Sequence, residues 1–227
     1  MRVWFKYMIK IKQESLILCL GYKFKFMNNS PVLERHPWQP FVPDNAKVLI
    51  MGTFPPQPHR WRMNFYYPNP TNDFWRVMGL IFYGDKLALY DKERKEFALA
   101  EIKVMLNREG IALSDTGHKI RRLKGNASDK YLEIVEPVDL QGLLDRMPEL
   151  TDIATTGEKA AGVVASLTGS KIPSVGSFVQ LDLPERRQPL RVWRMPSTSR
   201  AYPLAVEKKA AAYARLFASD KSTFLEL

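Results

Sequence analysis

A continuous apolar run, Lys47-Val48-Leu49-Ile50-Met51, ends at Gly52 and constrains the fold more than any other segment. A strand with one face in water alternates apolar and polar residues, whereas a strand covered on both faces is apolar throughout. We therefore predict that this run is a central strand of a parallel sheet with helices on both faces.

Predicted strands and helices alternate along the rest of the chain. We expect helices at 74–81, 91–108, 139–147, 158–167 and 203–218, and strands at 111–115, 152–156, 174–183 and 189–195. This order predicts an α/β fold, a three-layer α/β/α domain with a central, mainly parallel sheet and right-handed crossovers. Ligands of such sheets bind beyond the carboxyl ends of the strands, so the loops after Met51, Asp115, Thr156 and Met195 should converge on one site.

The N-terminal segment differs in charge from the rest of the chain. Residues 1–26 hold six basic residues and one acidic residue, which is half of the formal net charge of +10. We interpret Met27 as the true start, residues 1–26 as an extension, and residues 27–227 as a single domain. No apolar stretch reaches the roughly 18 residues of a membrane span, and we expect a cytoplasmic protein.

Metal and disulfide chemistry have few candidate residues. Cys19 is the only cysteine, which excludes a disulfide scaffold, a cysteine-based zinc module and a cysteine-ligated iron–sulfur cluster. The histidines His36, His59 and His118 lie far apart without ligand spacing. We expect no metal and no cofactor, and a monomer.

A basic segment follows the strand at 111–115. We predict a loop at 118–130 whose cations contact DNA phosphates, with Arg121, Arg122 and Lys124 as the main candidates. The alternative is a solvated face with no partner.

Three further segments have the residue types of a nucleic-acid site. They are Gly52-Thr53-Phe54-Pro55-Pro56, then Tyr66-Tyr67-Pro68-Asn69-Pro70-Thr71-Asn72-Asp73-Phe74-Trp75, then Pro196-Ser197-Thr198-Ser199-Arg200. Glycine lets a ligand approach the backbone, aromatic rings stack on bases, and small hydroxyl side chains with exposed amides bind phosphate. Each segment also has a purely structural interpretation. The first could be a stiff corner after the strand, and the third a serine turn. In the second, Asn72 could cap a helix while Trp75 lies in the core.

The order and spacing of these segments resemble the uracil-DNA glycosylase superfamily, and the mismatch-specific and hypoxanthine-type branches are the most similar. The likeness covers about residues 47–217. It implies that Gly52–Pro56 holds the catalytic water and the deoxyribose, and that Tyr67 stacks on the flipped base. It also implies that Pro196–Arg200 compresses the DNA backbone and enters the duplex, and that Asp115 lies near the base edge.

Two positions depart from the pattern of the well-studied branches. Phe54 stands where those branches have Asp, Asn or Glu to position water, and Met195 stands where relatives often have His or Asn. The single Cys19 excludes the cluster-containing branches. The segment Gly52–Pro56 corresponds to the first motif of the superfamily, and the hypoxanthine-type branch also lacks a polar third residue in that motif. By the resemblance to this branch, Asn72 occupies the catalytic position.

The resemblance implies a monofunctional DNA N-glycosylase, a hydrolase that flips a deaminated base and cleaves its N-glycosidic bond in base-excision repair. Uracil, hypoxanthine and xanthine are the candidate bases. Asn72 would stabilise the transition state, and Asp115 would act as a base or anchor the end of a strand. The alternative is a weak or inactive glycosylase-fold protein that binds damaged or single-stranded nucleic acid, which Phe54 and Met195 favour.

Overall fold

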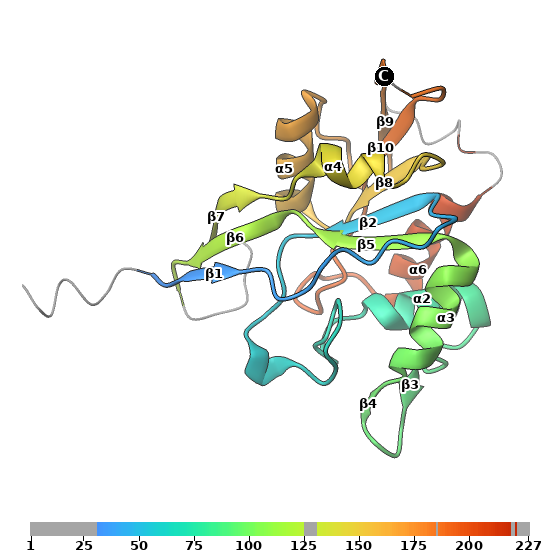
Figure 1. The fold of residues 1–227 in the computed structure, drawn as a ribbon. Helices are drawn as coiled ribbons and strands as arrows, with labels where there is room; N and C mark the ends of the chain where they lie inside the picture. Colours follow the sequence, from blue (N-terminus) through green and yellow to red (C-terminus); the bar gives the residue numbers. More distant parts are fainter. Residues whose placement is uncertain (1–30, 125–130, 185, 219–220, 222–227) are drawn as a thin grey trace, which may run out of the picture.

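A five-stranded sheet forms the centre of the computed structural model, which describes residues 31–124, 131–184, 186–218 and 221 (Figure 1). In spatial order its strands are β5 (Ile111–Asp115), β2 (Val48–Gly52), β8 (Asp152–Thr155), β10 (Leu190–Arg194) and β9 (Phe178–Leu181). The first four pair in parallel, and β9 pairs antiparallel with β10 at one edge. The prediction of a central, mainly parallel sheet is confirmed.

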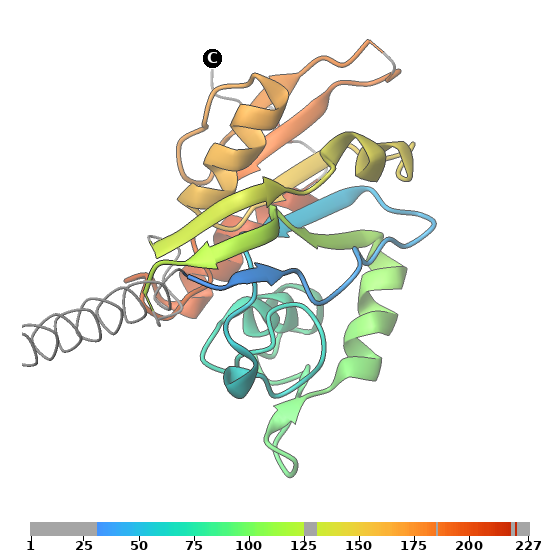
Figure 2. The same ribbon diagram turned by 60° about the vertical axis from the view of Figure 1, so that its left-hand side comes forward.

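Helices cover both faces of this sheet (Figures 1 and 2). One face carries α4 (Leu140–Asp145) and α5 (Glu158–Thr168), and the other carries α2 (Phe74–Tyr83), α3 (Leu99–Glu109) and α6 (Val206–Ala214). Successive side chains of a strand point to opposite faces. In β2, Val48 and Ile50 belong to the core beside α2 and α3, and Leu49 and Met51 to the core beside α4. The apolar run is therefore buried on both sides, and the three-layer α/β/α architecture is confirmed.

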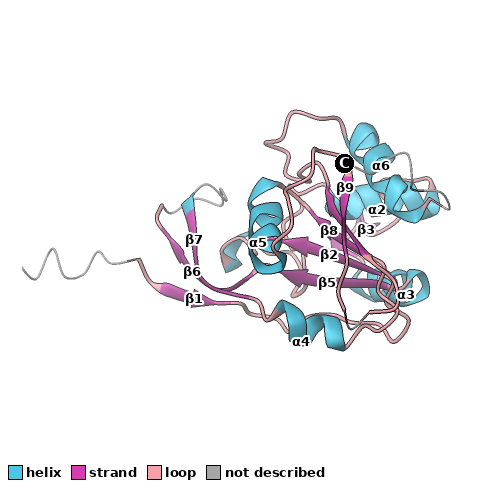
Figure 3. Ribbon diagram, turned by 90° about the horizontal axis from the view of Figure 1, so that it is seen from above, coloured by secondary structure: helices cyan, strands magenta, loops and turns pink. Residues whose placement is uncertain are grey.

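A separate three-stranded sheet lies beside the main one (Figure 3). It has the order β1 (Leu33–Arg35), β6 (Gly117–Arg122) and β7 (Leu132–Pro137), with antiparallel pairing throughout. The predicted loop at 118–130 is thus wrong for 118–122, which form β6, whereas 125–130 lie outside the described residues. Ile120 is fully buried among half-buried cations, and one apolar residue is too weak a pattern to predict a strand.

The predicted helix at 91–108 is also wrong in its first part. A short hairpin of β3 (Tyr90–Asp91) and β4 (Glu96–Phe97) precedes α3. The Asp91 carboxylate accepts hydrogen bonds from the backbone N–H groups of Glu93 and Arg94, both at 2.9 Å. An aspartate can cap a helix or close a turn in this way, so sequence alone does not separate the two. Val104, expected to point inward, is 63% exposed.

The remaining differences concern the ends of the fold. The last helix begins at Val206 rather than Pro203, and single turns of 3₁₀ helix occur at η1 (Pro58–Arg60) and η3 (Arg215–Phe217). The proposed extension 1–26 and start at Met27 lie outside the described residues. Within the ranges that the structure describes, no helix has the length and apolarity needed to cross a membrane.

Candidate active site

The parallel register of β2 and β5 creates the centre of the site. It pairs Gly52 with Asp115, the last residues of the two strands. A Cβ atom built on Gly52 would lie 2.5 Å from Asp115 Oδ1 and 3.3 Å from the Tyr67 hydroxyl oxygen. Only glycine leaves room for this carboxylate, so the glycine of the first motif is required by Asp115 as well as by any ligand.

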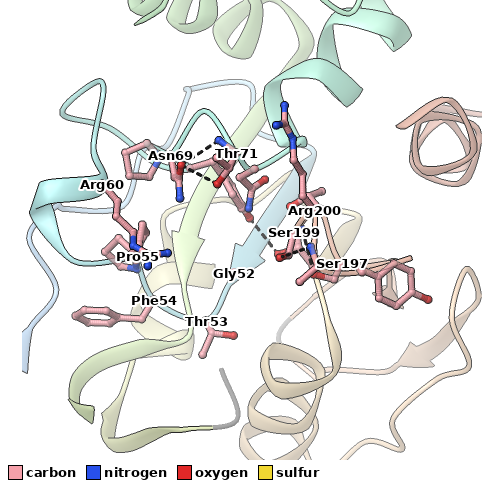
Figure 4. A pocket seen from close by; sticks show the side chains of 18 of the residues that line it. Gly52, Thr53, Phe54, Pro55, Arg60, Asn69, Thr71, Ser197, Ser199 and Arg200 are labelled. Carbon is pink, nitrogen blue, oxygen red and sulfur yellow. Dashed lines mark hydrogen bonds between the residues drawn. The ribbon is translucent and has the colours of Figure 1, made fainter. Parts of the chain in front are cut away.

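A cavity of about 650 Å³ opens beyond the carboxyl ends of the strands (Figure 4). Its walls come from the segments after β2, before α2, after β5 and β8, and between β10 and α6. Eleven of the sequence-predicted site residues line it: Gly52, Thr53, Phe54, Pro55, Tyr67, Asn72, Asp115, Ser197, Thr198, Ser199 and Arg200. The loops predicted to converge therefore do meet, at the end of the sheet where ligands of such folds bind.

Asp115 is held by a histidine that the sequence analysis did not select. His36 Nε2 donates to Asp115 Oδ2 at 3.0 Å, and both side chains are almost fully buried. On the other side of the ring, Nδ1 lies 2.8 Å from the carbonyl oxygen of Trp38 and 3.2 Å from its backbone nitrogen. In either arrangement of the Nδ1 proton, Nε2 carries a proton toward the carboxylate.

The charge of Asp115 sets the protonation of His36. Burial by itself would lower the pKa of His36, but the hydrogen bond and negative charge of Asp115 outweigh burial and raise it above the ordinary value of 6.5. The pair is therefore an imidazolium beside a carboxylate over a wider pH range than an exposed histidine would allow.

Phe54 packs against this pair instead of positioning water. Its ring meets the His36 ring edge-on, with centroids 5.3 Å apart, and the Arg122 guanidinium lies 5.5 Å from the Phe54 centroid. In Figure 4 the Phe54 ring points away from Ser197 and Ser199. The departure at this position is thus explained in part, because an apolar ring here shields the ion pair of His36 from water.

The two adjacent tyrosines have different surroundings. Tyr66 is in the core, with its hydroxyl on the Gln39 carbonyl, whereas Tyr67 lines the cavity. Tyr67 has a φ of 52°, a left-handed backbone that bulky residues rarely adopt. Its ring stacks on Phe74 with centroids 3.8 Å apart, and its hydroxyl lies 3.3 Å from Thr156 Oγ1. Phe74 covers one ring face, so a base could stack only on the other.

Asn72 holds the start of α2. Its Oδ1 accepts a hydrogen bond from the Phe74 backbone N–H at 2.9 Å, which forms a turn just before the helix. The N-cap residue of α2 is Asp73, whose side chain makes no cap hydrogen bond, so the prediction that Asn72 caps the helix is wrong. The hydrogen bond to Phe74 fixes the orientation of the amide, and Nδ2 remains as a donor at the cavity wall. The expected core position of Trp75 is confirmed, since it is 1% exposed.

The segment Pro196–Arg200, here called the late loop, is bound to α2 and α6 by a buried ion pair. Lys209, with no exposed surface, places Nζ 2.9 Å from Asp73 Oδ2 and 2.9 Å from the Ser199 carbonyl oxygen. The Asp73 backbone N–H donates to the Thr198 carbonyl at 2.8 Å, and Arg200 Nε lies 3.3 Å from Asp73 Oδ1. These bonds fix the loop against the start of α2, beside Asn72.

Some of the residues predicted from the sequence to belong to the site do not line the cavity. Met195 is 1% exposed and packs in the core, so it does not line the cavity; Pro196 is buried too. Arg122 is 6% exposed and donates to both Glu34 carboxylate oxygens and to the Pro55 carbonyl, so its guanidinium is engaged within the protein. Arg121 lies 3.4 Å from Glu133, and Lys124 lies over the Tyr131 ring.

Two basic side chains at the site, those of His36 and Arg60, were missed from the sequence. His36 comes 79 positions before its partner, and only the pairing of β1 with β6 brings its segment beside β5. Arg60 lines the cavity from η1, is exposed, and has no acidic partner in the described part of the chain. Arg60 could have been selected from the sequence, because it forms a basic cluster with His59 and Arg62 in a proline-rich loop. No local sequence pattern pointed to His36.

The site combines three chemical functions. Asn72 Nδ2 is a donor, the Asp115 side chain offers an oxygen acceptor, and the backbone of Gly52–Pro56 lines the cavity. Among the described residues no three His, Cys, Asp or Glu side chains gather as metal ligands. This arrangement suits hydrolysis that relies on positioned hydrogen bonds.

Comparison with known structures shows the class of fold. A solution NMR structure of a Methanosarcina acetivorans protein, assigned as a uracil DNA glycosylase, matches with a TM-score of 0.54 and 23% identity. The match covers 82% of this chain and all of the other chain. The fold is thus that of the uracil-DNA glycosylases, with the cavity at the carboxyl ends of its strands.

Curated relatives narrow the class to a branch. A hypoxanthine DNA glycosylase of Methanosarcina barkeri is 28% identical over 129 residues, which is 56% of this chain and 74% of the relative. The hypoxanthine DNA glycosylase of Methanosarcina acetivorans is 31% identical over 128 residues, 56% of this chain and 73% of the relative. No established protein-family model matches. The chain belongs to the uracil-DNA glycosylase superfamily, in its hypoxanthine-type branch.

Replacing Lys209 with Met should strongly destabilise the protein, because among the described residues it leaves the buried Asp73 carboxylate with Arg200 as its remaining salt-bridge partner. We expect a loss of about 3 kcal/mol in the free energy of unfolding by urea. Lys208→Met, at the exposed neighbouring position, is the matched control and should change stability by less than about 0.5 kcal/mol. A loss no larger than that of the control would contradict a structural role for the Lys209 ion pair.

The His36–Asp115 pair should make stability depend on pH. Because the folded pKa of His36 is raised, its contribution is complete below the unfolded pKa of 6.5 and is lost as pH rises through the folded pKa. The difference in unfolding free energy between wild type and His36→Gln should therefore shrink on going from pH 6 to pH 9 in urea titrations. A difference that grows over this range would show that the pKa is lowered instead.

Proposed function

We propose that this protein is a DNA glycosylase that hydrolyses the N-glycosidic bond of a deaminated base, with hypoxanthine as the first candidate. One observation carries the proposal: Asn72, Asp115 and Tyr67 meet the first-motif backbone in one cavity of about 650 Å³. A flipped base needs such a pocket outside the duplex, with hydrogen-bonding groups on its edge and an aromatic ring beside it. The curated relatives named as hypoxanthine DNA glycosylases support the choice of base.

Asn72 is the side chain we assign to the transition state. Cleavage of the glycosidic bond leaves positive charge on the sugar and negative charge on the departing base. The Asn72 Nδ2 group can donate to the developing negative charge, and its orientation is fixed by the hydrogen bond that Asn72 Oδ1 accepts from the Phe74 N–H. A donor held in place before the reaction does not have to reorganise during it.

Asp115 is the acid of the cavity. Its Oδ2 is bound by His36, while Oδ1 lies over Gly52 and makes no hydrogen bond within the described residues. That oxygen can accept from the attacking water or from an N–H group of the base. The segment Gly52–Pro56 also lines the cavity, and we place the water and the deoxyribose against it.

We propose that DNA approaches the mouth of the cavity between two loops. Arg60 lies on one side and Ser197, Ser199 and Arg200 lie on the other (Figure 4). Serine hydroxyls and amides of a rigid loop suit contact with phosphate oxygens. Phosphate contacts by Arg121 and Lys124, which lie away from the cavity lining, remain predictions from the sequence.

The function is tested by incubating the protein with oligonucleotides that contain hypoxanthine, uracil or xanthine. Alkali then cleaves the strand wherever a base has been released. Strand cleavage with at least one of these bases and none with the unmodified strand supports the proposal. No cleavage with any of them would favour the alternative, a protein that binds nucleic acid without cutting the bond.

Substitution of Asn72 separates its two roles. Asn72→Ala should slow single-turnover base release by about 10²- to 10³-fold, because a positioned donor is lost. It should also cost about 1 kcal/mol of stability through loss of the hydrogen bond to the Phe74 N–H. Asn72→Asp keeps an oxygen for that hydrogen bond but has no donor, so it should unfold like wild type and release base as slowly as the alanine variant. Normal base release by Asn72→Asp would show that only the hydrogen bond to Phe74 matters.

Arg60 should contribute to DNA affinity through phosphate contact. We expect Arg60→Ala to lower the slope of log affinity against log salt concentration by about one in oligonucleotide binding measurements. Arg94→Ala, in the exposed turn between β3 and β4, is the control and should leave the slope unchanged. Equal slopes for wild type and Arg60→Ala would place the phosphate contacts elsewhere.

A further inference from the structure

We propose that a second cavity, beside the late loop, binds a phosphodiester group of the DNA strand, and that Arg76 is the main side chain that binds it. This inference rests on the proposed function in one respect, namely that DNA is the ligand of the neighbouring active site. It adds a separate binding site between α2 and α6. It also adds two side chains, Arg76 and Lys86, that lie outside the active-site cavity.

The second cavity has a volume of about 420 Å³ and carries an excess of positive charge. Among the described residues that line it, the charged ones are Asp73, Arg76, Lys86, Arg200 and Lys209. The rest of the wall is apolar and comes from Leu87, Leu204 and Val206. Four basic groups and one acidic group predict an anionic ligand. The apolar wall suits the carbon atoms of the sugars on either side of a phosphodiester.

The carboxylate of Asp73 is already occupied by two of these cations. Its Oδ2 lies 2.9 Å from Lys209 Nζ, and its Oδ1 lies 3.3 Å from Arg200 Nε. Lys86 makes an ion pair at 3.2 Å with Glu207, which is outside the cavity lining, and both side chains are at least half exposed. Exposed ion pairs contribute little free energy, so Lys86 can exchange Glu207 for a phosphate at little cost.

Arg76 is the cation of this cavity that makes no ion pair within the described residues. It is half-buried on α2, and its Nη1 donates to the carbonyl oxygens of Pro70 and Asn72 at 2.8 and 3.2 Å. Its guanidinium carbon lies 5.8 Å from the Tyr90 ring centroid and 5.9 Å from that of Phe97. These contacts hold the guanidinium in place and leave Nε and Nη2 without a hydrogen-bond partner in the part of the chain described. A fixed guanidinium with two such donors suits bidentate binding of phosphate.

The cations of the cavity also destabilise one another. Burial and the positive charge of Arg200 lower the pKa of Arg76, and the negative charge of Asp73 opposes that shift without cancelling it. A partly buried charge without a paired opposite charge is costly. An anion bound between Arg76 and Arg200 would remove that cost.

Arg200 connects the second cavity to the active site. Its side chain lines both cavities, and in Figure 4 it runs from the late loop toward α2. A strand whose nucleotide enters the active-site cavity therefore passes the second cavity within reach of the same arginine. This arrangement favours a phosphate of that strand, rather than a free phosphate ion, as the ligand.

The test neutralises one phosphate of the DNA at a time. The ligands are single-stranded oligonucleotides with one hypoxanthine nucleotide and a neutral methylphosphonate placed in turn at each position around it. A 2′-fluorine on the target sugar disfavours positive charge there and keeps the glycosidic bond intact, so the full chain can be used without cleavage. At one position or more, we expect the methylphosphonate to weaken binding by wild type about 10-fold and binding by Arg76→Gln less than about twofold.

Substitutions around the cavity should act in opposite directions. Arg76→Gln and Lys86→Gln should each lower the slope of log affinity against log salt concentration by about one. Glu207→Gln removes the competitor for Lys86 and should raise affinity about two- to fivefold. Lys208→Gln, on α6 but outside the cavity lining, is the matched control for loss of a positive charge and should leave the slope unchanged.

If Arg76→Gln does not fold by circular dichroism, the exposed variants Lys86→Gln and Glu207→Gln decide the question by slope and affinity. Methylphosphonate patterns that are equal in wild type and Arg76→Gln would overturn the inference. So would unchanged binding in both exposed variants. Inorganic phosphate, titrated alone at low salt, separates the two sources of ligand: binding of this ion through Arg76 without any coupled methylphosphonate position would show a free-anion site and overturn the assignment to DNA.

Failure of the inference and failure of the proposed function give different results. Base release from the unfluorinated strand, without a methylphosphonate position coupled to Arg76, would leave the glycosylase intact and remove the second cavity from DNA binding. A coupled position in a protein that releases no base would support the phosphate site in a protein that binds DNA without hydrolysis.

Discussion

The pairing of Gly52 with Asp115 at the ends of β2 and β5 is the constraint on which the rest of the site depends. Because Gly52 has no side chain, the Asp115 carboxylate can lie over its backbone, and no larger residue would fit without displacing it. The contact forms part of the cavity wall, leaves the second carboxylate oxygen to His36, and lies beside the Tyr67 hydroxyl. A glycine in this motif is usually explained by the approach of a ligand, but here a neighbouring acid requires it as well.

The surroundings of Phe54 show how a chain can lack a polar residue in its first motif and still present an organised site. The phenylalanine ring lies between His36 and Arg122, and Arg122 in turn joins Glu34 of the small sheet to the Pro55 carbonyl. The small sheet therefore supports the first-motif loop from outside. The polar groups of the cavity come instead from Asn72, Asp115 and the backbone.

The opposite wall is rigid for a different reason. A fully buried lysine is costly unless its charge is paired and its protons are bonded. Lys209 meets both conditions through Asp73 and the Ser199 carbonyl, and this joins α6, the start of α2 and the late loop in one network. Asn72 is thereby held on a fixed element next to a fixed loop. Donors held in place in this way do not have to reorganise when charge develops on a bound ligand.

The sequence by itself determined the layers of the fold and the loops of the site. The apolar run at 48–51, the alternation of strands and helices, and the motifs around Gly52, Asn72 and Ser197 are local patterns, and local patterns follow from periodicity and capping. The sequence did not reveal β6, the β3–β4 hairpin or His36. Those features depend on contacts between distant segments: cross-strand acids that pair the β6 cations, and a β1–β6 pairing that carries His36 to Asp115. Only the tertiary structure decides such contacts, because the energy that selects them comes from partners far away in the chain.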